Sequence, residues 1–235
     1  MINNLSVLGL IPARGGSKGV PKKNIKLLNG IPLINYTIKA AKKSKYIDKL
    51  IVSTDNKEIS SICKDQNVEV PFVRPKNLSD DKAKSIDVII HALKFIEKKD
   101  NKVYNIILYL EPPSPLRSYN DINESLEIFI KKKPDSLVSV HEANQFHPIL
   151  MKKIENEYLK PIWKKEPEGI PRQLYNPTAY MRNGAIYIFK RENILNNILY
   201  GDKVFPYIMP IEKSICIDDI RDWYVAEQLI INEKK

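Results

Sequence analysis

Short apolar runs alternate with amphipathic stretches along most of this chain. The apolar runs are continuous, which is typical of strands buried on both faces. They lie at residues 7–11, 50–54, 68–73, 106–110, 136–140 and 182–189. The amphipathic stretches carry apolar residues at helical spacing, and they lie at residues 33–44, 56–66, 83–98, 121–132 and 219–233. This repeated order predicts an α/β fold, in which a mainly parallel sheet is covered by helices on both faces.

The pattern changes between residues 141 and 181, where prolines and aromatic residues replace the regular periods. We therefore expect an α/β domain made of residues 1–140 and 182–235, interrupted by a small inserted lobe at 141–181. The aromatic residues of this lobe show no helical period. Because aromatic side chains are enriched at protein interfaces, we expect the lobe to pack against a partner subunit.

Composition and charge narrow the class of protein. The 235 residues are 43% hydrophobic, enough for a core, and the formal charge is +10. Most lysines stand in short groups near predicted helix ends, and no zinc-finger, helix-turn-helix or stacking-aromatic motif accompanies them. The positive charge is therefore expected to lie on the solvated surface rather than to bind nucleic acid.

No apolar run reaches the ~20 residues of a membrane span, and the N-terminus lacks a secretory signal, so we expect a cytoplasmic protein that does not bind membranes. Cys63 and Cys216 lie far apart in sequence, which favours reduced thiols.

The loop that follows the first predicted strand combines glycines with cations. Its glycines allow successive N–H groups to point inward, and its cations supply positive charge, a combination that suits a polyphosphate. The residues concerned are Gly15, Gly16, Gly19, Arg14, Lys18, Lys22 and Lys23. The loop matches neither G-x-x-x-x-G-K-[ST] nor G-x-G-x-x-G. Because open α/β sheets bind ligands at strand ends, we predict a nucleotide here; a flexible basic surface turn is the alternative.

The residues 11–25, I-P-A-R-G-G-S-K-G-V-P-K-K-N-I, closely resemble the N-terminal signature of the cytidylyltransferases that activate sialic acids and related nonulosonic acids, the CMP-N-acetylneuraminate synthetase family. The resemblance continues in S-T-D at 53–55, V-P-F-V-R-P at 70–75, P-P-S-P-L-R at 112–117, R-N-G-A-I-Y-I at 182–188 and I-D-D-I-R-D-W-Y-V-A-E at 217–227. It implies a Rossmann-like domain with a dimerisation lobe. It also implies a homodimer that joins CTP to a nine-carbon 2-keto sugar acid, releases pyrophosphate, and uses Mg²⁺ or Mn²⁺.

The resemblance assigns nucleotide contacts residue by residue. It places Arg14 and Lys23 on the triphosphate, as catalytic groups, and has Asn24 close the loop. The other residues that it places around the nucleotide are Ala13, Gly15, Gly16, Ser17, Lys18, Arg74 and Ser85. Two of these have other interpretations, because Arg74 could pair with Asp80 or Asp81 and Ser85 could only cap its helix.

The late triplet Cys216-Ile217-Asp218 matches the place where the family carries D-I-D, so the first carboxylate is missing here. Asp218 is then the expected Mg²⁺ ligand and the third catalytic residue, because Mg²⁺ needs only one or two protein carboxylates besides phosphate oxygens and water. Cys216 is a poor ligand for a hard cation and is expected to pack beneath the site. This departure leaves the number of metal ions open.

Glu111 is a second departure, since many relatives carry Gln before this proline-rich segment. A carboxylate there would repel the sugar's carboxylate unless it binds Mg²⁺, takes up a proton, or accepts a hydrogen bond from an amide or ammonium group of the sugar. It could instead be the base that deprotonates the attacking hydroxyl. The sequence leaves these roles open.

The resemblance also implies sugar contacts. Arg172 is expected to bind the sugar carboxylate as a bidentate partner, with Lys152 as a second choice. Gln173, Ser114 and Asn183 are expected nearby. The sugar itself stays open among N-acetylneuraminic, legionaminic and pseudaminic acids. The alternative functions are a 3-deoxy-manno-octulosonate cytidylyltransferase and a non-catalytic protein that binds nucleotides or nucleic acid.

Overall fold

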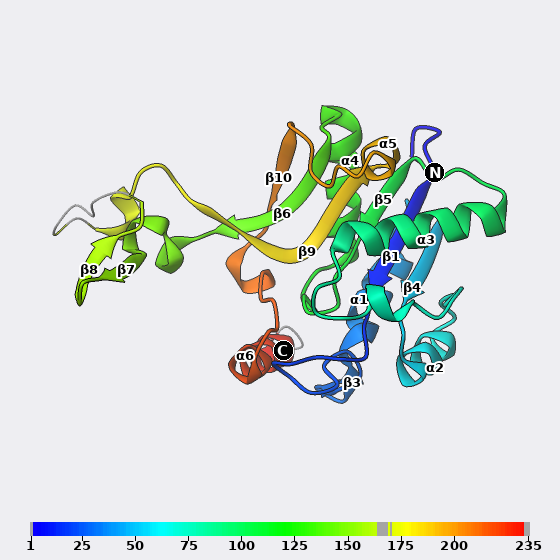
Figure 1. The fold of residues 1–235 in the computed structure, drawn as a ribbon, viewed down its shortest axis with the longest axis horizontal. Coiled ribbons are helices and arrows are strands. Elements are labelled where there is room, and N and C mark those ends of the chain that lie inside the picture. Colours follow the sequence, from blue (N-terminus) through cyan, green and yellow to red (C-terminus); the bar gives the residue numbers. More distant parts are fainter. Residues whose placement is uncertain (1, 164–168, 170, 233–235) are drawn as a thin grey trace.

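The computed structural model describes residues 2–163, 169 and 171–232, and a six-stranded sheet of order β10-β6-β9-β5-β1-β4 forms its centre (Figure 1). The strands are β1 (Val7–Pro12), β4 (Lys49–Ser53), β5 (Ile106–Tyr109), β6 (Ser136–Glu142), β9 (Tyr180–Lys190) and β10 (Val204–Ile208). β1 runs parallel to β4 and β5, and β10 runs parallel to β6. Only β9 is antiparallel to its neighbours β5 and β6. The predicted mainly parallel sheet is confirmed, with β9 as its exception.

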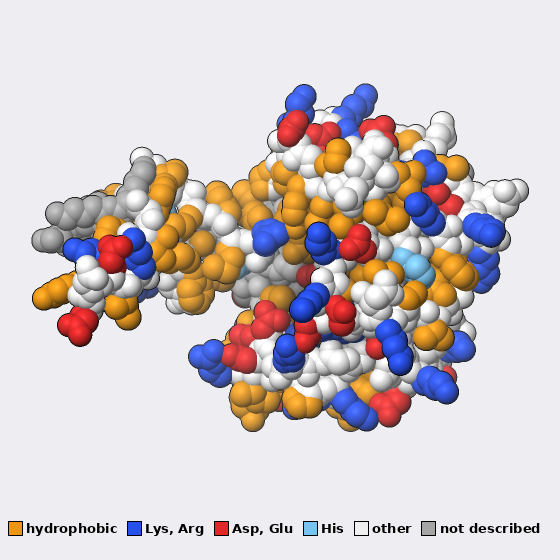
Figure 2. Space-filling view, in the orientation of Figure 1, with side chains coloured by type: hydrophobic (Ala, Val, Ile, Leu, Met, Phe, Trp, Pro, Cys, Tyr) orange, Lys and Arg blue, Asp and Glu red, His pale blue; other side chains and the backbone are white. Residues whose placement is uncertain are grey.

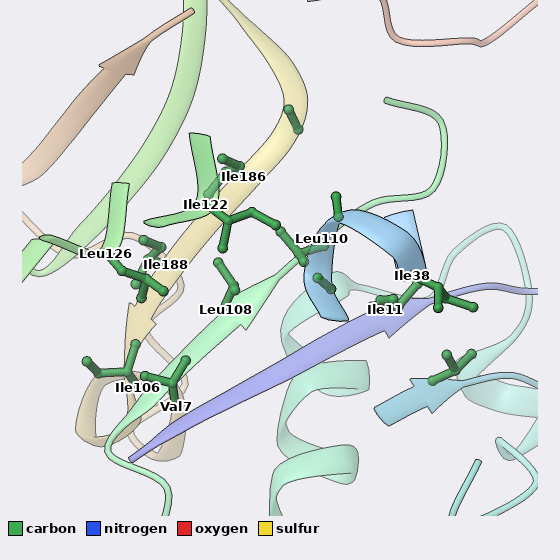
Figure 3. Close-up of a cluster of buried hydrophobic side chains, with 14 of the residues drawn as sticks. Val7, Ile11, Ile38, Ile106, Leu108, Leu110, Ile122, Leu126, Ile186 and Ile188 are labelled. Carbon is green, nitrogen blue, oxygen red and sulfur yellow. The ribbon is translucent and has the colours of Figure 1, made fainter. Parts of the chain in front are cut away.

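Helices cover both faces of this sheet. They are α1 (Leu33–Lys43), α2 (Lys57–Asp65), α3 (Ser85–Asp100), α4 (Tyr119–Lys132), α5 (Arg191–Leu195) and α6 (Ile220–Asn232). On one face, side chains of α1, α2 and α4 pack on the strands, and Figure 3 shows Ile38 of α1 and Leu126 of α4 in this cluster with Val7 of β1. On the other face, α3 and α5 supply Ile89, Leu93 and Ile194, among others. The two-sided cover explains why the strands are continuous apolar runs.

Two helices begin where the sequence offers a capping side chain. Asn56 accepts a hydrogen bond from the backbone N–H of Ile59 at the start of α2. At the start of α4, the Ser118 side chain accepts from the backbone N–H of Asp121, and the Asp121 side chain accepts from the backbone N–H of Ser118. These contacts satisfy N–H groups that have no partner within the helix.

Two parts of the fold differ from the sequence-based prediction. The expected strand at 68–73 is reduced to isolated bridges, one of Glu69 with Ile51 and one of Val73 with Thr54, because Pro71 between them has no N–H for a ladder. β10 was not predicted from the sequence. It contains Pro206 and is an edge strand, where proline is more readily accepted than in a central strand. The last predicted helix is present as α6, and its expected final residue, Glu233, lies outside the described residues.

A small hairpin projects from the body of the molecule. It consists of the antiparallel strands β7 (Lys152–Glu155) and β8 (Tyr158–Pro161) and lies beyond the ends of β6 and β9 (Figure 1). The ladder between β6 and β9 continues to Glu142 and Tyr180, inside the range expected for the lobe. Residues 164–168 and 170 of that range lie outside the described residues. Figure 2 shows hydrophobic side chains gathered on the projection. The exposed large apolar residues between positions 146 and 174 are Phe146, Met151, Ile154, Tyr158, Leu159, Ile162, Trp163 and Leu174.

Charged side chains are spread over the surface rather than gathered in one place, as the apolar ones are on the projection. On the face shown in Figure 2, Lys and Arg are interspersed with Asp and Glu and do not form one continuous basic band. Among the described residues, no helix is both long enough and apolar enough to cross a bilayer.

Arg117 joins three parts of the fold from an almost completely buried position, 3% exposed. Its guanidinium donates to the carbonyl of Ala185 in β9 at 2.7 Å, to the Thr37 hydroxyl in α1 at 2.6 Å and to the carbonyl of Glu111 at 3.3 Å. The proline-rich segment after β5 is thereby held against both the sheet and α1.

We expect Arg117→Met to lower the free energy of unfolding by about 3 kcal/mol. The substitution removes charge-assisted hydrogen bonds and leaves the two carbonyls and the Thr37 hydroxyl buried without this partner. Urea denaturation followed by circular dichroism measures this loss. The matched control is Arg221→Met, whose side chain is 87% exposed and pairs with Asp219 at the surface; it should leave the free energy of unfolding close to that of the wild type. Equal stability of both variants would contradict the role given to Arg117.

Candidate active site

The carboxyl ends of β1, β4 and β5 meet at one edge of the sheet because these strands are parallel. A cavity of about 410 Å³ lies at this edge. Its lining residues come from the glycine-rich loop, from the segment after β4, from the start of α3 and from the residues after β5: they include Arg14, Gly16, Ser17, Lys23, Asn24, Arg74, Asp80, Asp81, Ser85, Tyr109, Glu111, Cys216 and Asp218. Most of the residues that the sequence places around a nucleotide therefore share one cavity.

Backbone contacts hold the glycine-rich loop in place. The N–H of Ala13, which is fully buried, donates to the carbonyl of Ser53. The N–H of Gly15 donates to the Asp55 carboxylate at 2.8 Å, and the Asn24 side-chain amide donates to the carbonyl of Arg14 at 3.0 Å. The loop is thus tied to the end of β4 and closed upon itself. Ala13 and Gly15 shape the loop without lining the cavity.

The loop also touches a segment about 200 positions later in the chain. A Cβ built on Gly19 would lie 1.9 Å from the carbonyl oxygen of Asp218, so only glycine allows this approach. Next to it, Lys23 Nζ donates to the carbonyl of Ile217 at 2.6 Å and lies 3.3 Å from an Asp218 carboxylate oxygen. The Asp222 carboxylate accepts from the N–H groups of Asp218 and Asp219. The cavity wall formed by Asp218 is therefore fixed from both sides.

One carboxylate holds two cations of the glycine-rich loop. Asp81 pairs with Arg14 at 2.7 Å and also with Lys18, and these two cations lower the pKa of Asp81, Lys18 contributing most. Lys18 itself is largely exposed and does not line the cavity. A polyanion entering the cavity would compete with Asp81 for Arg14.

Arg74 and Ser85 occupy positions inside the cavity. Arg74 is 5% exposed and donates to the carbonyls of Ser53 and Leu78. The alternative in which Arg74 pairs with Asp80 or Asp81 is therefore wrong. Ser85 is the first residue of α3, the cap position belongs to Lys84, and no side-chain hydrogen bond caps this helix. Ser85 lines the cavity, and its hydroxyl interacts with the side chain of Tyr109.

Glu111 and Cys216 line the cavity and lie close to Gly184, which has a φ of +68°. A Cβ there would lie 3.1 Å from Cys216 Sγ, 3.2 Å from a Glu111 carboxylate oxygen and 3.3 Å from Ser114 Oγ. Burial, and then the charge of Asp218, raise the pKa of Glu111 to about 7 against the opposing effect of nearby cations. Burial raises the pKa of the Cys216 thiol to about 12, so this side chain is neutral at neutral pH.

The carboxylates of Glu111 and Asp218 suit a hard divalent cation such as Mg²⁺. Among the described residues, no cluster of three or more His, Cys, Asp or Glu side chains forms a ready-made metal cage. Glu111 and Asp218 line the same cavity, and the charge of Asp218 adds to the larger effect of burial in raising the pKa of Glu111. A cation between them would relieve the repulsion between the two carboxylates, and Mg²⁺ accepts one or two carboxylates when phosphate oxygens and water supply the rest. These residues fit a Mg²⁺ ion that arrives with a phosphate ligand.

A second cavity of about 340 Å³ adjoins the first. Both are lined by Ser85, Tyr109, Glu111 and Cys216. The second cavity is otherwise lined by Ile89, Arg182, Gly184, Tyr187, Phe189, Leu199 and Tyr200. Neither its aromatic wall nor Arg182 was predicted from the sequence. Arg182 stood within a quoted motif, whereas Leu199 and Tyr200 belong to a stretch between α5 and β10 without a regular pattern.

The structure places two of the expected sugar contacts within the protein interior. Ser114 is fully buried, and its hydroxyl donates to the carbonyl of Asn183. Asn183 is 1% exposed, and its side chain accepts from the Ser139 hydroxyl at 2.6 Å and donates to the Ser214 hydroxyl at 2.9 Å. Both side chains make hydrogen bonds that support β9, and neither residue lines either cavity of this chain, so their contact with a sugar stays a prediction.

Three further residues expected at the sugar lie elsewhere. Arg172 and Gln173 form a short turn at 172–174, and Lys152 begins β7. All three belong to the region of the projecting hairpin, and none lines either cavity of this chain. Their contact with a sugar stays a prediction that a single chain does not test.

Comparison with known proteins shows which family this chain belongs to. Residues 8–209 match a family model described as cytidylyltransferase. The chain is 34% identical over 230 residues to a CMP-N,N'-diacetyllegionaminic acid synthase of Legionella pneumophila, covering 96% of this chain and 97% of that protein. It is also 34% identical over 225 residues to the post-translational flagellin modification protein B of Campylobacter coli, covering 95% and 94%. An N-acylneuraminate cytidylyltransferase of Escherichia coli is 32% identical over 234 residues, and the chain spans 52% of its length.

A solved structure of a CMP:2-keto-3-deoxy-manno-octonic acid synthetase complexed with CTP is similar in fold. Its TM-score is 0.69 at 16% sequence identity, and the match covers 97% of this chain and 99% of that chain. A 4-diphosphocytidyl-2C-methyl-D-erythritol synthase from Anaerococcus prevotii gives a TM-score of 0.65 at 14% identity, covering 97% and 99%. At such identities these likenesses establish the fold alone.

We expect Glu111 to make the stability of the ligand-free protein depend on pH. Its pKa is about 7 when folded against the ordinary 4.5, so the folded state binds more protons between these values. The free energy of unfolding should therefore fall as pH rises from 4.5 through 7, by about 3 kcal/mol in total. Urea titrations at a series of pH values measure this slope.

The Glu111→Gln variant has no proton to lose and should remove this part of the slope. Glu212→Gln, at an exposed carboxylate, is the control and should keep it. An unchanged slope in Glu111→Gln would show that the carboxyl titrates at its ordinary value.

Proposed function

This chain belongs to the cytidylyltransferase family, and on that premise we propose that it transfers the cytidylyl group of CTP to a nine-carbon 2-keto sugar acid of the sialic acid type. The relatives named as CMP-legionaminic acid synthase and N-acylneuraminate cytidylyltransferase support this class of sugar. N-acetylneuraminic, legionaminic and pseudaminic acids are the candidates. Pyrophosphate is the second product.

The observation that carries the proposal is the pair of adjoining cavities. The first has the glycine-rich loop and the cations Arg14 and Lys23, which suit a triphosphate. The second has aromatic walls and a few polar groups, which is typical of a site for a small organic ligand. Because four residues line both, a nucleotide and a sugar bound side by side would meet at Glu111.

The reaction requires one bond to form and one to break. The anomeric hydroxyl oxygen attacks the α-phosphorus, the bond between this phosphorus and pyrophosphate breaks, and the hydroxyl proton passes to a base. Negative charge develops on the phosphate oxygens and the leaving pyrophosphate. Arg14 and Lys23, which are already fixed by Asp81 and by the Ile217 carbonyl, would stabilise this charge without first being ordered.

Asp218 would hold Mg²⁺, which in such a site neutralises phosphate charge. Glu111 either completes the ligand set or accepts the proton of the attacking hydroxyl. A pKa of about 7 suits a proton acceptor at neutral pH, because such a group is partly deprotonated and still basic.

We further propose that the protein acts as a homodimer through the projecting lobe. The exposed apolar side chains on this hairpin are a surface that a second copy could cover. A cytoplasmic location also stays a proposal, and it agrees with the supply of CTP there.

The direct test is release of pyrophosphate by the purified protein with CTP and Mg²⁺. Four sugar acids are compared: N-acetylneuraminic, legionaminic, pseudaminic and 3-deoxy-manno-octulosonic acid. We expect one nonulosonic acid to turn over far faster than the octulosonic acid. Equal turnover of the octulosonic acid would favour the alternative assignment, and absence of release with every acid would refute the proposal.

A neighbouring pair of lysines provides a matched test of the loop. Lys23 lines the cavity and donates to the Ile217 carbonyl, whereas Lys22 is exposed and pairs with Glu58. Replacing Lys23 by Met should lower kcat by ~100-fold or more, because a fixed partner of the developing charge is lost. Lys22→Met should keep kcat near the wild-type value. Similar kcat values for both variants would remove Lys23 from the reaction.

A further inference from the structure

Asp81 bridges two cations of the glycine-rich loop. It lies between the 3-10 helix Lys76–Leu78 and α3, and each of its carboxylate oxygens contacts a different cation. Oδ1 lies 2.7 Å from a guanidinium nitrogen of Arg14, and Oδ2 pairs with the ammonium group of Lys18. One carboxylate thus joins two side chains that stand four positions apart in the loop.

Asp81 is also the one acidic partner found for both cations among the residues that the structure describes. No other ion pair or side-chain hydrogen bond of Arg14 or Lys18 is found there. Lys23 is held differently, because its ammonium group donates to the backbone carbonyl of Ile217. The charges of Arg14 and Lys18 are therefore balanced within the described chain by a single carboxylate.

The contacts of Asp81 are open to exchange. The side chains of Arg14, Asp81 and Lys18 are 35%, 46% and 82% exposed, respectively. Ion pairs with this much exposure to water contribute little to stability. A ligand that carries more negative charge than one carboxylate can therefore replace Asp81 at small cost to the fold.

The cavity beside this bridge carries further positive charge. Arg74 and Lys23 line it together with Arg14. Burial chiefly, and to a smaller extent the charge of Arg14, lower the pKa of Arg74, so the two guanidinium groups are close enough to repel each other. Asp81 reduces this accumulation of charge, as a bound polyanion would.

A phosphate group would use the same two cations in the same way. This step rests on the function proposed above, in which Arg14 binds the triphosphate. A phosphate group offers an oxygen to each cation, as the carboxylate does, and a polyphosphate carries more charge. A carboxylate that stayed beside the phosphate would repel it. Asp81 and a phosphate group therefore compete for Arg14 and Lys18.

We propose that Asp81 is an internal competitor of the polyphosphate: Arg14 and Lys18 exchange its carboxylate for phosphate oxygens when CTP binds, and take it back as pyrophosphate leaves. Arg14 is then in place before the phosphates arrive, and only its partner changes. The competition lowers the affinity of the site for pyrophosphate, the second product. Asp81 thereby favours release of this product and limits its inhibition of the enzyme.

The test is binding of inorganic pyrophosphate, measured by calorimetry in the presence of Mg²⁺. Asp81→Asn removes the charge and keeps the shape of the side chain. We expect it to lower the dissociation constant of pyrophosphate by about three- to ten-fold, the range for one or two partly exposed ion pairs. Asp81→Glu keeps the charge and should stay near the wild-type value.

Asp80→Asn is the matched control. Asp80 lines the same cavity, its carboxylate accepts from the backbone N–H of Lys82, and no ion pair of Asp80 is found among the described residues. An asparagine oxygen can accept the same hydrogen bond, so this variant removes one negative charge from the cavity and leaves the partner of Arg14 in place. It should change the dissociation constant much less than Asp81→Asn does.

Kinetics supply a second readout. Pyrophosphate inhibits the forward reaction as a product, and its inhibition constant should fall in Asp81→Asn by the same factor as the dissociation constant. The KM of CTP should fall as well, because CTP displaces the same carboxylate.

Three outcomes of the calorimetry overturn the proposal. Weaker binding of pyrophosphate by Asp81→Asn would show that Asp81 orders the loop instead of competing with the ligand. Unchanged binding would show that the bridge has no effect on the site, and equal tightening in Asp80→Asn would show only a general effect of charge. Because calorimetry needs no turnover, these results decide the inference separately from the proposed function, which fails when no sugar acid releases pyrophosphate. Failure of the wild type to bind pyrophosphate would overturn the phosphate site, and this inference with it.

Discussion

The close contact between the glycine-rich loop and the segment 216–218 is the constraint on which the candidate site depends. Gly19 meets the carbonyl of Asp218 at a distance that no side chain would allow, and Lys23 donates to the carbonyl of Ile217. These contacts bring cations of the loop and the carboxylate of Asp218 together in the lining of one cavity. A second contact continues the wall, because the N–H of Ile217 donates to the carbonyl of Pro113, two residues after Glu111.

The site is built from opposed charges that are already in place. Asp81 holds Arg14, the Asp218 carboxylate lies beside Lys23, and Glu111 is enclosed among neighbours of both signs. Such a site does not have to order its cations when a polyanion arrives, which is the condition for effective stabilisation of charge in a transition state. The burial that makes Glu111 a weak acid also makes it sensitive to a metal ion or a cationic group beside it.

The sequence predicted the parts of this molecule that follow from local pattern. The buried strands, the helices and the position of the glycine-rich loop at the end of β1 could be inferred because period and glycine content are local signals. The burial of Asn183 and Ser114 could not be predicted, because a motif tells which residues matter without telling whether a side chain points into the core or into a cavity. Arg182 was missed for a related reason: its partner Tyr200 is 18 residues away in an irregular stretch, and only the folded chain brings the two together.

The measurement that tests this account most directly is CTP binding to Gly19→Ala, by calorimetry in the presence of Mg²⁺. The added methyl group would collide with the backbone of Asp218, so the loop and the 216–218 segment must separate. Circular dichroism should show a folded protein, since the sheet and its helices are untouched, and CTP affinity should fall by ~10-fold or more. A folded Gly19→Ala variant that binds CTP as tightly as the wild type would contradict the claim that this contact forms the nucleotide site.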